Sequence, residues 1–243
     1  MLILAVDTSS PSGSLAVLRD DRVIGSVSAW TGELYSSRMF RQLEFLLHEL
    51  SLSLEDFDLF AATVGPGSFT GLRVGLAAVK GWGEVYRKPI AAVSALKAVA
   101  AQAHSDLPLV VPVLDAHRGQ IYSAIYRRSE GSGHAWLTLL GEEMVIAPSE
   151  FLEVLRAKAA AVDLAIVTPV PELLASALSL CETKGVRAGC MRIEQASLIL
   201  APHVGRLAAL HAAEGKLEDS LTLDANYVRR SDAELHWKVP AGS

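Results

Sequence analysis

Two aspartates stand where short apolar runs end, and each is followed by a turn. Asp7 follows residues 2–6, and Asp115 follows residues 110–114. Such runs predict buried strands. A carboxylate at a strand end can help to hold a metal ion or, together with backbone N–H groups, a phosphate. The same side chains can instead cap their own turns, and the sequence leaves both interpretations open.

The most distinctive segment, residues 65–71, reads Gly-Pro-Gly-Ser-Phe-Thr-Gly and joins a predicted strand to a predicted helix. Its glycines allow close approach of the backbone to a ligand, and Thr70 is a candidate helix cap. The spacing fits neither the dinucleotide fingerprint nor a P-loop. Bulky His117 and Arg118 in the second turn leave a working and a degenerate nucleotide cleft both open. The candidate cleft residues are Asp7, Thr8, Ser9, Gly65, Pro66, Gly67, Ser68, Thr70 and Asp115.

Two predicted helices offer a second kind of site. Residues 36–50 carry an apolar stripe, and residues 70–86 carry glycine or valine at every fourth position. Each glycine inside a helix costs about 1 kcal/mol relative to alanine, so the row predicts close packing. The packing is either against the chain's own sheet or against a partner helix. The predicted interface consists of Ser36, Met39, Phe40, Leu43, Leu47, Gly71, Arg73, Gly75, Val79 and Gly83.

Other catalytic patterns are weak. The seven histidines include no pair spaced to share one helical face, and no serine stands in a G-x-S-x-G frame. We therefore predict no catalytic residue, no metal and no cofactor for this chain.

Composition narrows the class of protein. The 243 residues are 51% hydrophobic and 20% charged, with a net charge of −5, as in a folded soluble protein. Basic residues form only doublets, whereas proteins that grip nucleic acid alone usually show a basic stripe. No apolar run reaches the roughly 20 residues that span a bilayer. No secretory signal is evident, and the 2 cysteines lack C-x-x-C spacing, so we expect a cytoplasmic protein.

The pattern of apolar residues is repeated along the chain. It predicts strands and helices in the order βββαβαβα, and it restarts at Leu109. Placing Asp115 on Asp7 puts residues 123–127 on residues 15–19 without a gap. The expected fold is α/β with two βββαβα-type lobes, residues 1–105 and residues 106–243.

Three segments resemble the TsaB (YeaZ) family of the actin/Hsp70-like (ASKHA) superfamily. They are residues 4–9 (Leu-Ala-Val-Asp-Thr-Ser), residues 65–75 (Gly-Pro-Gly-Ser-Phe-Thr-Gly-Leu-Arg-Val-Gly) and residues 115–122 (Asp-Ala-His-Arg-Gly-Gln-Ile-Tyr). The agreement is strong as far as Arg127 and loose beyond it. Two departures are Tyr35-Ser36-Ser37, where many relatives have a His-Ser-Glu type sequence, and Ala225, where proline is expected.

The resemblance implies a duplicated, RNase H-like ATPase fold and a required but non-catalytic subunit. Its partners would be a TsaD-like enzyme subunit and a TsaE-like ATPase, which together install threonylcarbamoyl on the adenosine next to the tRNA anticodon. Contact with tRNA would be indirect, and a homodimer would form in the absence of TsaD. TsaD-like proteins carry metal-binding histidines on the first long helix, and residues 35–40 have none. The alternatives are a kinase or metallopeptidase of the same superfamily, or a stand-alone nucleotide sensor.

Overall fold

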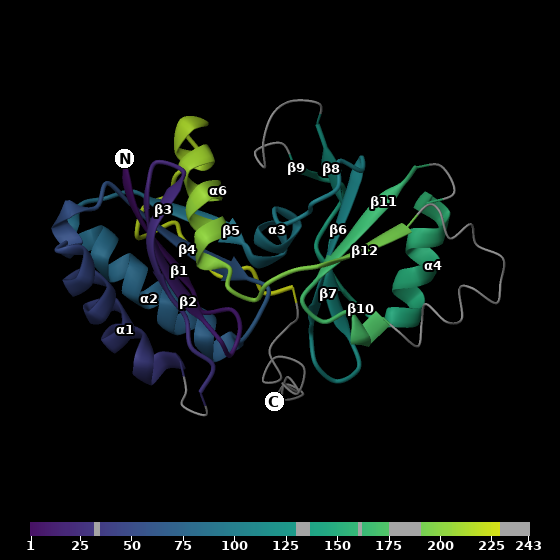
Figure 1. Ribbon diagram of the computed structural model, residues 1–243, viewed down its shortest axis with the longest axis horizontal. Helices are drawn as coiled ribbons and strands as arrows, with labels where there is room; N and C mark the ends of the chain where they lie inside the picture. Colours follow the sequence, from purple (N-terminus) through teal and green to yellow (C-terminus); the bar gives the residue numbers. More distant parts are fainter. Residues whose placement is uncertain (32–34, 130–136, 160–161, 175–190, 229–243) are drawn as a thin grey trace, which may run out of the picture.

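The computed structural model describes residues 1–31, 35–129, 137–159, 162–174 and 191–228. They form two sheets with helices packed on their faces (Figure 1). The first half contains β1 (Leu2–Asp7), β2 (Ser14–Arg19), β3 (Arg22–Val27), α1 (Tyr35–Leu50), the 3-10 turn η1 (Leu54–Asp56), β4 (Leu59–Gly65), α2 (Phe69–Tyr86), β5 (Ile90–Ser94) and α3 (Ala95–Ala100). The second half contains β6 (Leu109–Asp115), β7 (Ile121–Ser123), β8 (Tyr126–Arg128), β9 (Leu137–Leu139), β10 (Met144–Ile146), α4 (Pro148–Ala159), β11 (Leu164–Thr168), β12 (Met191–Gln195) and α6 (Ala201–Ala213).

The two sheets repeat one topology. The first has the order β3-β2-β1-β4-β5, and the main path of the second is β10-β7-β6-β11-β12. In each, an antiparallel hairpin leads to a central strand, and two further strands continue in parallel. The predicted duplicated α/β fold is therefore confirmed.

The ungapped alignment of the two halves fails between the β1–β2 hairpin and the β6–β7 hairpin. Asp7 pairs with Ser14, whereas Asp115 pairs with Ile121, so the second hairpin is one residue shorter. Its outgoing strand is also divided into β7 and β8. Apolar alternation could not reveal this difference, because β2 and β7 are buried on both faces and so show no alternation that would mark a one-residue shift.

Alternation along β1 divides the hydrophobic core into layers. Leu4 and Val6 face α1 and α2 on the outer side of the first sheet. Ile3 and Ala5 point the other way, into a central layer that contains α3, α6 and one face of the second sheet. The helix α4 covers the far face of the second sheet. The order across the molecule is helices, sheet, helices, sheet, helix (Figure 1).

After the second sheet, the chain returns to the first one. The helix α6 packs on β1 and β2, and Glu218 pairs with Ile90 of β5. Leu223 is fully buried in the outer core, and the N–H of Asn226 donates to the carbonyl of Val64. The predicted lobe boundaries divide the strands as the sheets do, but residues 201–228 lie on the first sheet. The boundaries themselves stay a prediction.

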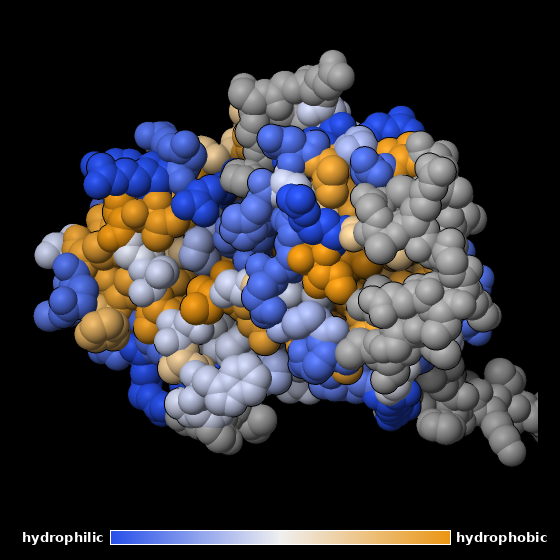
Figure 2. All heavy atoms as spheres, turned by 45° about the vertical axis from the view of Figure 1, so that its right-hand side comes forward, coloured by the Kyte–Doolittle hydropathy of each residue, from blue (hydrophilic) through white to orange (hydrophobic). Residues whose placement is uncertain are grey.

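The surface does not indicate a membrane-spanning segment. Within the described ranges, no helix combines the length and apolar composition needed to cross a bilayer. On the face drawn in Figure 2, hydrophobic groups gather in several areas separated by hydrophilic side chains.

Glu143 joins three separate parts of the chain. Its carboxylate accepts hydrogen bonds from the hydroxyl of Ser94, from the hydroxyl of Tyr126 at 3.3 Å and from the amide of Asn226 at 2.8 Å. Burial raises the pKa of Glu143, and the three hydrogen bonds oppose that rise. This carboxylate therefore ties the segment after α6 to both sheets.

We expect replacement of Glu143 to change stability and its pH dependence. Glu143→Ala leaves three donors without an acceptor and should lower the free energy of unfolding by about 1–3 kcal/mol. Because the folded pKa is raised, the stability that Glu143 contributes is present below pH 4.5 and is lost as pH rises through the folded pKa. Urea unfolding at a series of pH values should show a larger loss in the native chain than in Glu143→Gln, in which Asp7 still titrates but position 143 does not. A constant difference between the two proteins would contradict it.

Candidate functional site

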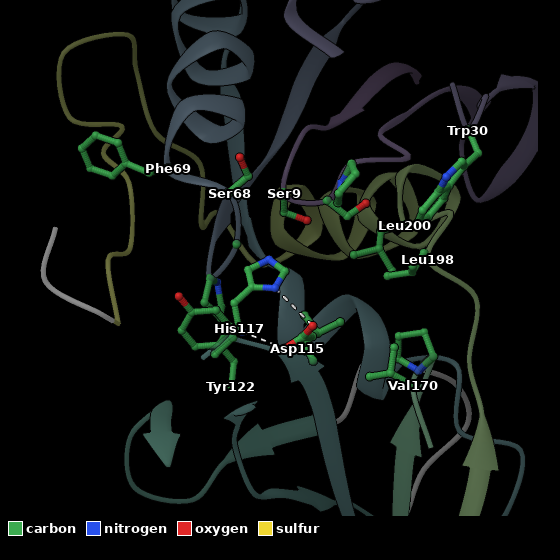
Figure 3. A pocket seen from close by; sticks show the side chains of 17 residues that line it. Ser9, Trp30, Ser68, Phe69, Asp115, His117, Tyr122, Val170, Leu198 and Leu200 are labelled. Atoms are coloured by element: carbon green, nitrogen blue, oxygen red, sulfur yellow. Dashed lines mark hydrogen bonds and ion pairs between the residues drawn. The ribbon is translucent and has the colours of Figure 1, made fainter. Parts of the chain in front are cut away.

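A pocket of about 440 Å³ lies between the two sheets, beside the ends of β1 and β6 (Figure 3). The first lobe contributes two turns and Trp30, and the second contributes the hairpin after β6 and two short connecting segments. Most of the lining is apolar. The lining residues are Ser9, Ser10, Pro11, Trp30, Pro66, Gly67, Ser68, Phe69, Leu114, Asp115, Ala116, His117, Tyr122, Pro169, Val170, Leu198 and Leu200.

Asp7 is enclosed behind this pocket rather than exposed in it. Its side chain is fully buried, and Oδ1 accepts the N–H of Ser9 at 3.0 Å, the hydroxyl of Ser9 at 2.6 Å and the hydroxyl of Thr63 at 2.9 Å. Burial raises the pKa of Asp7. These contacts are those of a turn cap on Oδ1, whereas Oδ2 is buried without a hydrogen-bond partner among the described residues.

The Gly65–Gly71 loop packs directly on the turn after β1. The N–H of Ser68 donates to the carbonyl of Ser9 at 2.7 Å, and a Cβ on Gly67 would overlap that same carbonyl. A Cβ on Gly71 would overlap the carbonyl of Thr8. The glycines therefore permit contact between two segments of the chain, and the N–H groups of Ser68 and Gly71 donate inside the protein.

The cap of α2 is Ser68 rather than the predicted Thr70. The side chain of Ser68 accepts the N–H of Gly71 at 3.2 Å, so the helix begins at Phe69. Thr70 is exposed and does not line the pocket. The sequence prediction was wrong because both residues are good caps, and only the packing of the loop decides between them.

Asp115, unlike Asp7, reaches the pocket. Its Oδ1 accepts the N–H of His117 at 2.7 Å, and its Oδ2 lies 3.2 Å from Nδ1 of the same histidine, with 39% of the aspartate side chain exposed. Figure 3 shows the imidazole lying between Asp115 and the turns of the first lobe. The sequence analysis did not include His117 in the site. The signal was the Asp-x-His spacing, since an aspartate that caps its own turn holds the residue two positions on.

The glycine row of α2 faces the chain's own sheet. A Cβ on Gly75 would overlap the side chain of Thr8, and one on Gly83 would lie 2.8 Å from Ile90. Val79 is fully buried between them. Of the two interpretations of the row, the contacts support packing within the chain. Gly81 has no atom within 4 Å of its Cβ position.

The predicted stripe of α1 is likewise its core face. Met39 and Leu43 are buried, and Leu47 is partly buried against the same cluster. Phe40, by contrast, is 52% exposed. The side chain of Ser36 lies outside the described residues. Periodicity identified the apolar face correctly but could not show that the chain itself covers it.

Arg73 is exposed at the start of α2 and contacts the segment after α6. Its Nε donates to the hydroxyl of Tyr227 at 3.2 Å, and its guanidinium lies 3.8 Å from the ring centre of Phe69. The rings of Phe69 and Tyr227 are 4.9 Å apart. This group lies at the border between the pocket and the outer face.

Comparison with known proteins decides the family. The family model described as TsaD, tRNA N6-adenosine threonylcarbamoyltransferase, matches residues 25–181. The Bacillus subtilis protein named tRNA threonylcarbamoyladenosine biosynthesis protein TsaB is 32% identical over 158 residues, which are 65% of this chain and 67% of that protein. This chain belongs to the TsaB/YeaZ family. The Escherichia coli protein of the same name is 32% identical over 54% of this chain and 57% of its own length.

Solved structures of TsaB/YeaZ type share the fold. A Pseudomonas aeruginosa protein described as similar to the peptidase YeaZ superposes with a TM-score of 0.73 at 25% identity, over 94% of this chain and 99% of that protein. The two-lobed actin-like architecture predicted from the sequence is thus confirmed. Within the described ranges, no group of three His, Cys, Asp or Glu side chains is placed to hold a metal ion.

We expect two glycines of α2 to respond in opposite ways to the same substitution. Gly75→Ala forces a Cβ into Thr8 and should lower the free energy of unfolding by about 1–3 kcal/mol. Gly81→Ala meets open space and should raise it by about 1 kcal/mol, because alanine is the better helix former. Chemical denaturation of both variants checks this. Equal effects at the two positions would contradict the inward orientation of the row.

We expect Asp7 to tolerate an isosteric change. Asp7→Asn keeps the Oδ1 acceptor and should leave the free energy of unfolding within about 1 kcal/mol of the native value, whereas Asp7→Ala should lower it by about 2 kcal/mol. Urea unfolding measures both. An aspartate that binds metal or orders phosphate would instead lose function in the asparagine variant while the fold stayed intact.

Proposed function

We propose that this chain acts in the biosynthesis of tRNA threonylcarbamoyladenosine as a non-catalytic, cytoplasmic subunit that binds a TsaD-like enzyme subunit and assembles with a TsaE-like ATPase. The observation that carries the non-catalytic part is the closure of the loops around Asp7. Family membership supports the pathway, since the relatives from Bacillus subtilis and Escherichia coli are named for it.

The residues that line the cleft are poorly suited to binding and hydrolysing a nucleotide. Asp7 is sealed behind Ser9, and the N–H of Ser68 is used by the chain itself. Among the lining residues that the structure describes, none is Lys or Arg, so a triphosphate would enter without a positive side chain. These features favour a subunit over the kinase, metallopeptidase and nucleotide-sensor alternatives.

The outer face of α1 and α2 is the surface that we assign to the partner. Both helices lie on the side of the first sheet that faces away from the second lobe (Figure 1). Phe40 and Phe45 are 52% and 57% exposed on α1, and Val85 is 73% exposed on α2. We take these exposed apolar side chains as the candidate contacts for a partner.

The solvent-facing side of α2 also carries small residues. Ala77 and Gly81 are exposed one helical turn apart, in line with Arg73 and Val85. Small residues allow the axis of a partner helix to approach closely. The interface therefore keeps Phe40 and Arg73 from the predicted set and replaces the buried glycines with Ala77 and Gly81. A homodimer in the absence of the partner would use the same face.

The test is binding to a TsaD-like subunit. Phe40→Asp combined with Ala77→Arg should abolish co-purification with that subunit and, in a reconstituted reaction, the formation of threonylcarbamoyladenosine. Both residues are exposed, so the melting temperature should stay near the native value. Leu139→Asp, at an exposed position of β9 in the other lobe, is the matched control and should bind normally.

Two results would overturn this function. Full complex formation by the double variant would show that the assigned surface does not bind the partner. ATP turnover by the purified chain alone, or stoichiometric zinc or iron in it, would favour the enzyme alternatives.

A further inference from the structure

The pocket between the lobes has the size of a small-molecule site. Its volume of about 440 Å³ lies within the range of roughly 300–1,000 Å³ typical of such sites. Its wall is assembled from segments far apart in the sequence, including residues 9–11, 66–69, 115–117 and 169–170. A ligand bound there would contact both lobes at once.

The polar groups of the pocket favour a positively charged ligand over a negatively charged one. Asp115 and His117 are its only ionisable pair among the described lining residues, and the other polar side chains are those of serines and Tyr122. No lining residue in the described ranges is Lys or Arg. The N–H groups of Ser68 and His117 already donate within the chain, so an anion would have neither these two donors nor a Lys or Arg side chain to balance its charge.

The carboxylate of Asp115 can accept a further hydrogen bond. An ionised carboxylate has about four acceptor sites, and the contacts with His117 occupy one on each oxygen. With 39% of its side chain exposed, Asp115 remains accessible from the pocket. It lies near the centre of the labelled side chains in Figure 3.

Aromatic side chains in the lining also favour a positively charged ligand. Trp30 and Tyr122 line the pocket, and the faces of such rings attract cations. Phe69 also lines it, but its ring is already covered by Arg73 and Tyr227. Trp30 is 73% exposed, so a ligand can cover its indole without displacing packed atoms. Leu198 and Val170 add aliphatic surface for the body of a ligand.

We propose that the pocket between the lobes binds a small organic cation with an aromatic or aliphatic body, with the ammonium group held by Asp115. The site excludes nucleotides by the same composition. This proposal does not depend on the partner assignment, because Asp115 and His117 belong to the second lobe, whereas the assigned partner surface lies on α1 and α2.

A series of three indoles that differ only in the end group tests the proposal. They are tryptamine (an ammonium), tryptophol (a hydroxyl) and indole-3-propionate (a carboxylate), each titrated into the full chain at pH 8 by calorimetry. We expect tryptamine to bind about tenfold more tightly than tryptophol, because a charged hydrogen bond is stronger than a neutral one. Indole-3-propionate should bind most weakly, and ATP should not compete.

Two variants locate the site. Asp115→Asn can still accept the N–H of His117 and should reduce the affinity for tryptamine to that for tryptophol. Val170→Trp, which fills the pocket from a different segment, should abolish binding of both. Leu139→Asp lies outside the pocket and should change neither affinity. Melting temperatures near the native value confirm that each variant is folded.

Each remaining outcome contradicts the proposal. Equal affinity for the three indoles would show an apolar cavity without a charge preference. Absence of binding by all three at millimolar concentration would show that the pocket is not a site. Competition by ATP, or tightest binding by the carboxylate, would assign the pocket to anions.

Discussion

The contact between the turn after β1 and the loop before α2 decides what the cleft of this protein can do. In that contact, the carbonyl of Ser9 accepts the N–H of Ser68, while the hydroxyl and N–H of Ser9 point back to Asp7. Oδ1 of Asp7 and the N–H of Ser68 are thereby satisfied within the chain, and Oδ2 of Asp7 is left buried without a hydrogen-bond partner among the described residues. Glycine at position 67 is required, because any side chain there would meet Ser9. The loops are thereby held together, and the N–H of Ser68 is withdrawn from solvent.

The second half of the molecule repeats the strand order of the first half. It does not repeat the enclosure of the strand-end aspartate. Asp115 occupies the position equivalent to Asp7 at the end of a central strand, yet its side chain is open to the pocket. The difference follows from the hairpins. The first turn returns a serine hydroxyl to the carboxylate, whereas the second presents an imidazole. Duplication has given one buried aspartate and one accessible aspartate, and only the accessible one can meet a ligand.

The sequence was sufficient to predict the strands, the long helices and the duplication, because these depend on apolar periodicity and on turn residues. It placed Asp115 at the end of a strand, where the structure puts it beside the pocket. It could not decide whether Gly75 faces a sheet or a partner, since both require the absence of a side chain. It also missed His117 and chose Thr70 over Ser68 as the cap. In these cases the answer depends on contacts between segments distant in the sequence, which local patterns do not encode.

The return of α6 to the first sheet has a consequence for synthesis on the ribosome. The helices α1 and α2 follow closely behind β1 and can cover its outer side early. The inner side, with Ile3, Ala5 and Leu18, is covered by Val204 and Leu207 of α6, which are made only after the entire second sheet. During that interval the nascent first lobe presents an uncovered hydrophobic surface. Protection of this surface, by a chaperone or by rapid elongation, would therefore matter more for this chain than for one whose lobes are completed in order.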